Sequence, residues 1–244
     1  MARQKILLAT LVVTLIVAVL SVLLAPVAVA TGLRLWLRWA APRDNLLVEV
    51  GNIEAPFLRP VVLHRLHLTS RPGTPFAVKI DAARVEVAFN LAAFFRPATG
   101  RQIRTLTVDG IDIDIRRPPD LAVPSAAFGL RFVHDLLASE FTLSHARLHL
   151  ENGNTIVDLR DASLTAAEIE SGVFTAGEFA INSPWLRKTF LQLRGATSWQ
   201  ENRLTVGALM LMRGLDLDAL IIDLSRIGEK GLSMEITLDA FGGK

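Results

Sequence analysis

From Ile6 to Val29 the chain runs for 24 residues without a charged side chain. A helix rises about 1.5 Å per residue, so this run reaches about 36 Å, enough to cross a hydrocarbon core of about 30 Å. The run predicts a membrane-spanning helix that tethers the rest of the chain to a bilayer. A cleaved signal peptide is the alternative, because Ala28-Val29-Ala30 has the small residues of a cleavage site. The apolar run is about twice the usual length for a signal peptide, so we expect a retained anchor.

The residues that follow the run combine tryptophan with arginine. Arg34, Trp36, Arg38 and Trp39 have the composition of a membrane–water boundary, where indole rings and snorkelling arginines are common. We therefore predict that residues 1–43 form an anchor and a juxtamembrane segment, with these four side chains at the membrane interface. A short linker helix is the alternative. Basic residues flank the apolar run on both sides, so charge alone does not fix its orientation.

The body of the chain, residues 44–244, is close to neutral. Five of the 26 Lys and Arg residues precede Asp44, which leaves 21 basic against 24 acidic side chains. No basic tract with interleaved aromatic residues is present, which argues against a nucleic-acid partner. Cysteine is absent, so disulfides and thiolate metal sites are excluded. About 200 residues suffice for one sizeable domain.

The body reads as about a dozen short strands joined by Gly, Asn, Pro and Asp. Met234, Ile236 and Leu238 alternate with polar residues, as half-buried strands do. Comparable runs occur near Leu47–Val50, Val62–Leu68, Ile111–Ile115, Phe141–Leu150, Thr155–Leu159, Val173–Ile181, Phe190–Trp199 and Leu204–Met212. Strands in direct succession predict a mainly β fold with a mostly antiparallel sheet.

Several strands change the parity of their apolar residues. Val78 and Ile80 lie on one parity and Val85 and Val87 on the other, and a similar change occurs across Asp109-Gly110. It recurs within 141–150 and 215–222. Bulges would absorb such slips and curve the sheet into a groove or half-barrel. At Asp109-Gly110 a tight type I′ hairpin is the alternative, and the local sequence favours it.

Only two short helices are expected in the body, at Asn90–Arg96 and Ala127–Ser139. Two short helices do not cover the apolar face of about a dozen strands. That face is covered by a second sheet layer in a sandwich, by a partner protein, or by lipid.

The order of segments in the first half of the chain resembles the start of AsmA-like proteins, which are related to TamB and to chorein-type lipid-transfer proteins. After the apolar amino-terminal run come Leu58–Leu68 and Ile80–Val87, then a short apolar helix with Leu91, Phe94 and Phe95, and then Ile103–Ile115. The resemblance implies a single-pass anchor in the bacterial inner membrane with the body in the periplasm. It also implies a curved sheet whose concave apolar face takes phospholipid acyl chains, and a role in lipid transfer or outer-membrane biogenesis.

Under this resemblance the expected partner is membrane lipid. A dozen strands span only about 58 Å, so either the chain is a truncated or minimal member of the family or other envelope proteins extend the groove. The residues expected to contact lipid are Val85, Val87, Phe89, Leu106, Val108, Ile111, Ile113 and Ile115. The length of the chain also suits two anchored periplasmic groups, the N-protein of type II secretion and the C-protein of lipopolysaccharide export. A structural or secretion-associated module with a closed core is therefore the alternative function.

Catalytic and metal-site patterns are not evident in the sequence. His145 and His149 share a strand face but lie about 13 Å apart along it, and His64 and His67 are expected to point to opposite faces. Asp109, Asp112 and Asp114 lack the spacing of a calcium loop. No nucleophile elbow, phosphate loop or dinucleotide fingerprint occurs. We therefore expect no catalytic, metal-binding or cofactor-binding residues, and a protein that is not an enzyme.

Overall fold

The computed structural model describes residues 24–56, 59–74, 76–90, 101–117, 137–212, 215–225 and 233–240. Residues 24–40 form a helix, which a short 3-10 turn, η1 (Ala41–Asp44), joins to the first strand. The strands are β1 (Leu46–Glu54), β2 (Val61–Ser70), β3 (Ala77–Phe89), β4 (Ile103–Arg117), β5 (Ala138–Asn152), β6 (Thr155–Ala167), β7 (Gly172–Asn182), β8 (Arg187–Gln200), β9 (Arg203–Met212), β10 (Leu215–Asp223) and β11 (Ser233–Ala240).

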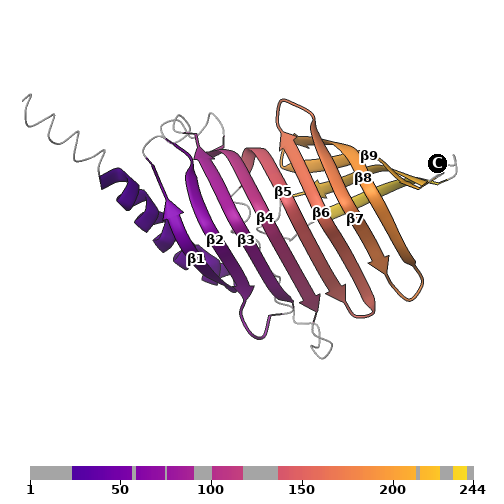
Figure 1. The fold of residues 1–244 in the computed structure, drawn as a ribbon, viewed down its shortest axis with the longest axis horizontal. Helices are drawn as coiled ribbons and strands as arrows, with labels where there is room; N and C mark the ends of the chain where they lie inside the picture. Colours follow the sequence, from indigo (N-terminus) through magenta and orange to yellow (C-terminus); the bar gives the residue numbers. More distant parts are fainter. Residues whose placement is uncertain are drawn as a thin grey trace, which may run out of the picture.

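All of these strands belong to one sheet, in which they follow one another in chain order from β1 to β11. The mainly β, mostly antiparallel architecture predicted from the sequence is confirmed, and the sandwich of two sheets is not what the described strands form. One pairing differs from expectation, because β4 and β5 are parallel. Figure 1 shows the sheet running from β1 at the left to β7 at the right, with the last strands turning behind it.

A line of irregular residues crosses the sheet near the middle of its strands. Each strand from β1 to β8 has one residue there that pairs with no neighbouring strand, and we call this line the crease. Its members on β1 to β8 are Gly51, Arg65, Ala83, Gly110, His145, Asp161, Gly177 and Gln192. Arg65, Gly110, His145, Asp161 and Gln192 have positive φ, between 50° and 64°, as the extra residue of a β-bulge often does.

The crease lets each strand keep its apolar side chains on one face. Leu63 and Leu68 are an odd number of positions apart on β2, yet both are buried in the same core cluster. Side chains that alternate strictly would place them on opposite faces, so the skipped Arg65 restores the phase. The predicted changes of phase are confirmed. Ala83 and Gly110 are skipped opposite each other without a shift of register, whereas register shifts at Leu143–Leu148 and Leu217–Ala219 confirm the bulges predicted within 141–150 and 215–222. The alternative hairpin at Asp109-Gly110 is wrong, because β4 continues through both residues.

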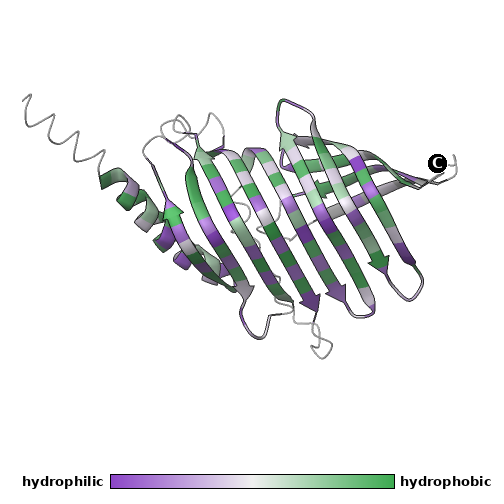
Figure 2. Ribbon diagram, viewed as in Figure 1, coloured by the Kyte–Doolittle hydropathy of each residue, from purple (hydrophilic) through white to green (hydrophobic). Residues whose placement is uncertain are grey.

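The apolar face of the sheet is concave and is covered differently at its two ends. Beside β1–β3, Leu37 and Ala40 of the helix are buried against the sheet. Toward the carboxyl terminus, β8–β10 curl over β5–β7, so that Leu193 and Leu209 pack against the small residues Ala146, Ala162 and Ala176. Figure 2 shows hydrophobic and hydrophilic residues alternating along the strands.

Several helical predictions fall outside the described residues. Most of the apolar run Ile6–Val29 does so, as do 91–96 of the first short helix and 127–136 of the second. Ala138 and Ser139, which were placed at the end of that second helix, instead begin β5. Within the described ranges, no helix is both long and apolar enough to cross a membrane.

Gly110→Val should destabilise the protein by about 2 kcal/mol, because a left-handed residue with a Cβ costs about 1–2 kcal/mol and a β-branched one costs more. A Cβ at this position would also lie 3.0 Å from the Cβ of Ala83. Equilibrium denaturation of the full chain in mild detergent measures the change. Gly153→Val is the matched control, since Gly153 also has positive φ and bears the same backbone cost but has open space around it, so the difference between the two variants reports the contact with Ala83. A Gly110→Val variant as stable as the parent chain would contradict the proposed role of the crease.

Candidate functional site: an apolar groove under the concave face

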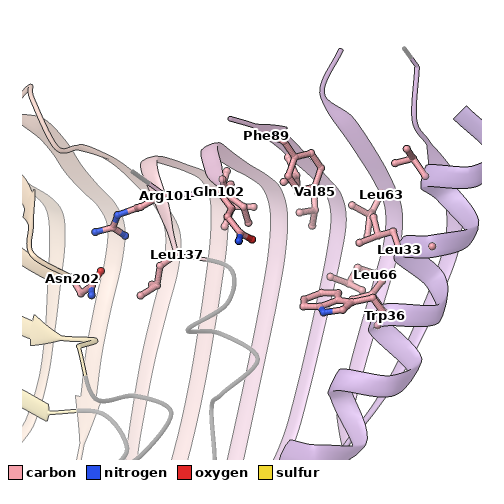
Figure 3. Close-up of a pocket in the computed structure, with 16 residues that line it drawn as sticks. Leu33, Trp36, Leu63, Leu66, Val85, Phe89, Arg101, Gln102, Leu137 and Asn202 are labelled. Carbon is pink, nitrogen blue, oxygen red and sulfur yellow. The ribbon is translucent and has the colours of Figure 1, made fainter. Parts of the chain in front are cut away.

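A groove of about 790 Å³ lies between the helix and the first strands of the sheet (Figure 3). Its volume falls in the range of small-molecule sites, about 300–1,000 Å³. The floor consists of apolar side chains from three neighbouring strands. They are Leu63 and Leu66 of β2, Val85, Val87 and Phe89 of β3, and Ile103 and Leu106 of β4.

The helix of residues 24–40 forms one wall. Val29, Leu33, Trp36 and Leu37 line the groove, at the spacing of three to four residues that places side chains on one face of a helix. Leu37 is buried, and Trp36 is half-buried and packs beside the core cluster. The helix is therefore held to the sheet by the same apolar contacts that form the groove.

The other side of the groove is closed by the curled end of β8. Trp199 is only 1% exposed and donates a hydrogen bond from its Nε1 to the carbonyl of Ala138, at 3.0 Å. Its ring also meets Phe141 edge to face, with the centroids 4.9 Å apart. These contacts hold the end of β8 against the start of β5, so that Asn202 in the next turn reaches the groove.

Polar groups gather at this closed side. Arg101 lies over the Trp199 ring, with its guanidinium carbon 4.7 Å from the ring centroid. The same guanidinium pairs with Glu168 at 2.6 Å and donates to the carbonyl of Ala138 at 3.1 Å. Arg101, Gln102 and Asn202 thus give a mostly apolar groove one polar side, an arrangement suited to a molecule with a hydrocarbon part and a polar part.

The predicted lipid-contact residues occupy the concave face. Val85, Val87, Phe89 and Leu106 line the groove itself. Val108 and Ile111 pack beside the core cluster next to it. Ile113 and Ile115 lie further along β4 and are half-buried.

The predicted membrane-interface residues separate on the helix. Arg34, Arg38 and Trp39 are exposed, whereas Trp36 faces the groove. Sequence reasoning did not single out Arg101 or Trp199. The alternation within Phe190–Trp199 placed Trp199 on a strand but carried no sign that the strand curls back over β5.

The convex face carries polar pairs between neighbouring strands. His145 Nδ1 lies 2.8 Å from Asp109 Oδ1, and His149 Nδ1 lies 2.7 Å from Asp158 Oδ1. His67 hydrogen-bonds with Asp81 in the same way. The expectation that His64 and His67 point to opposite faces is wrong. Because the crease passes between them at Arg65, both lie on the convex face.

Hydrogen bonds shift the pKa values of several of these groups. His145 and Ser144 hydrogen-bond to Asp109 and lower the pKa of its carboxyl group, and in return Asp109 raises the pKa of His145. Lys79 and His67 together lower the pKa of Asp81. The convex face is therefore a charged, hydrated surface, in contrast to the apolar groove on the other side of the same strands.

One open, curved β-sheet with a helix on its concave face and a groove between them defines a groove-forming β protein. This class is established by the topology and by the groove. No protein-family model and no curated protein matches the chain.

Trp199→Phe should destabilise the fold by about 1–3 kcal/mol, because it removes a buried hydrogen bond and leaves space in a packed contact. Chemical denaturation of the full chain measures this loss. Trp185→Phe serves as the control, since Trp185 is 85% exposed and its replacement should change stability by less than about 0.5 kcal/mol. Equal effects at both positions would show that Trp199 does not secure the curl.

The hydrogen bond with Asp109 should hold the pKa of His145 above the ordinary value for histidine, and Asp109→Asn should return the pKa toward that value. Because folding raises the pKa of His145, the His145–Asp109 pair stabilises the folded state. This stabilisation is fully present below the unfolded-state pKa of His145 and disappears as the pH rises through its folded-state pKa. NMR titration of the ring protons in both forms provides the measurement. An unchanged pKa in Asp109→Asn would contradict the pairing.

Proposed function

We propose that this chain is a membrane-anchored, periplasmic lipid-handling protein whose groove shelters the acyl chains of phospholipid during lipid transfer or outer-membrane biogenesis. The observation that carries the proposal is the groove of about 790 Å³, with an apolar floor, a helix for one wall and polar groups at one side. An acyl chain would lie along the concave face, and its polar headgroup would lie toward Arg101, Gln102 and Asn202.

The proposed mechanism is passive. Each methylene group removed from water is worth about 0.8 kcal/mol, so a groove that shelters part of an acyl chain lowers the barrier to moving a lipid through water. The sheet supplies this shelter without a chemical step, and the proposal includes neither a catalytic residue nor a cofactor. The half-buried Ile113 and Ile115 would continue the apolar path along β4 beyond the groove.

The proposed membrane anchor and the proposed location of the body rest on the amino-acid sequence. The apolar run Ile6–Val29 would hold the chain in the bacterial inner membrane, and the resemblance to AsmA-like proteins would place the body in the periplasm. The first and last strands of the sheet are natural places for other envelope proteins to extend the groove by strand pairing.

A second candidate function is a structural or secretion-associated module of the inner membrane. The curl of β8–β10 favours it, because Leu193, Val206 and Leu209 bury themselves against β5–β7 and need no lipid to do so. If the whole concave face were closed in this way, the chain would act as a tethered scaffold. The two functions differ in whether β2–β4 bind lipid.

Leu106→Trp should reduce phospholipid binding, because Leu106 lines the groove and the larger ring fills space that an acyl chain would use. Loss of shelter for about three methylenes corresponds to roughly a 50-fold weaker affinity. Mass spectrometry of lipid extracted from the purified full chain measures the bound amount. Thr107→Trp is the matched control, because this neighbour on β4 pairs with Glu86 and Thr142 and points to the convex face. Equal lipid content in both variants would refute groove binding.

Ile113→Asp separates the two candidate functions. At an open apolar surface the carboxylate stays hydrated, so we expect lost lipid photo-crosslinking with little change in stability. In a closed core an unpaired buried charge costs several kcal/mol, so unfolding of this variant would favour the scaffold. Thr107→Asp on the convex face controls for the added charge, and thermal unfolding followed by circular dichroism reports the stability of both variants.

A further inference from the structure

One end of the sheet gathers the start of β1, the β2–β3 turn, the ends of β4 and β5, and the β7–β8 turn. Register shows this directly, since Leu46 pairs with Ser70, Arg117 with Asn152, and Asn182 with Arg187. We call this end the basic rim; it lies along the lower edge of the sheet in Figure 1. From β1 to β8 it spans about 34 Å at a strand spacing of about 4.8 Å.

The β7–β8 turn presents an apolar tip at one corner of the basic rim. Ser183 closes the turn, because its backbone N–H donates to the Leu186 carbonyl at 2.8 Å and its Oγ accepts from the Leu186 N–H at 3.0 Å. This closure leaves Trp185 outside, with 85% of its surface exposed, and Leu186 41% exposed beside it. The exposed cations Arg187 and Lys188 follow immediately.

The opposite corner of the basic rim has a similar composition. Trp39, near the end of the helix, is 57% exposed, and the Arg43 guanidinium lies 3.3 Å from its ring centroid. Arg71 begins the neighbouring β2–β3 turn, where its N–H donates to the carbonyl of Asn45 at 2.8 Å. Exposed tryptophan beside arginine therefore marks both corners of one edge.

Charge is distributed unevenly between the two ends of the sheet. The cations at the basic rim are Arg43, Arg71, Arg116, Arg117, Arg187 and Lys188. Arg116 is paired with Asp114, Asp44 is buried, and Glu151 adds one carboxylate near the edge. The opposite end carries the carboxylates Glu54, Glu140, Glu168, Glu170, Glu201 and Asp223 and, among the described residues, the cations Arg59, Arg101, Arg104 and Arg203. Arg101 is paired with Glu168 and Arg203 with Asp223. Among the described residues, cations therefore outnumber carboxylates at the end that holds the exposed tryptophans, whereas carboxylates outnumber cations at the other end.

We infer that the basic rim docks on the surface of an anionic phospholipid bilayer. The Trp185-Leu186 tip enters the headgroup region, as amphipathic indole rings do at membrane interfaces, and the cations pair with lipid phosphates. Charge complementarity selects an anionic surface over a neutral one. The docking goes beyond the proposed function, because it does not depend on what the groove holds.

Vesicle flotation tests this inference. The full chain is held in nanodiscs of phosphatidylcholine and mixed with vesicles of phosphatidylcholine that contain or lack phosphatidylglycerol. We expect binding to the anionic vesicles only, and weaker binding as salt rises. Arg187→Glu with Lys188→Glu should weaken binding at least fivefold for each cation removed. Trp185→Ala should weaken it further when combined with these changes.

Matched variants show whether the rim is responsible. Arg194→Glu changes the same charge on β8 about 23 Å along the strand from Arg187, and it should leave vesicle binding unchanged. Ile169→Ala removes a side chain that is 97% exposed in the β6–β7 turn at the opposite end, and it should also have no effect. Equal binding to both kinds of vesicle, or equal losses for Arg187→Glu and Arg194→Glu, would overturn the inference. Leu106→Trp should keep vesicle binding, so failure of docking and failure of groove binding are distinguishable.

Discussion

A strand of 13 to 15 residues has one apolar face only if its apolar side chains recur at every second position. In this sheet the apolar positions change parity near the middle of the strands. The crease resolves the conflict by inserting one unpaired residue in every strand from β1 to β8. The insertions lie on neighbouring strands, so they bend the sheet along a common line. The crease therefore both keeps the apolar side chains on one face and curves the sheet. The concave face, the contact with the helix and the groove all depend on it.

Curvature alone does not cover the apolar face of the sheet. Different elements cover the carboxyl-terminal and the amino-terminal ends of this face. At the carboxyl-terminal end small residues let β8–β10 approach β5–β7, and Trp199 holds the curl through the carbonyl of Ala138. At the amino-terminal end the helix rests on β1–β3 but stands far enough from β4 to leave the groove. The proposed lipid-handling function is the use of this gap for acyl chains.

The strands and bulges were predictable because both follow from the parity of apolar residues along the sequence, as at Val78–Phe89 and Asp109-Gly110. The parallel pairing of β4 with β5 was not, because parity does not report strand direction. Of the groove, the floor residues Val85, Val87 and Leu106 were predicted from their place on the apolar face. Trp36, Arg101 and Trp199 acquire their places through contacts between segments far apart in the chain, which local patterns do not encode.

The chain contains no cysteine, so single cysteines along β4 report directly on an open, continuous concave face. We expect Thr107→Cys and Asp112→Cys to react with a water-soluble maleimide whether or not lipid is present. Leu106→Cys, Val108→Cys and Ile113→Cys should react only after lipid has been extracted, with the change of parity falling at the crease. If Leu106→Cys, Val108→Cys and Ile113→Cys stayed unreactive after extraction, the concave face would be closed by the protein itself. That result would contradict an open, continuous apolar face.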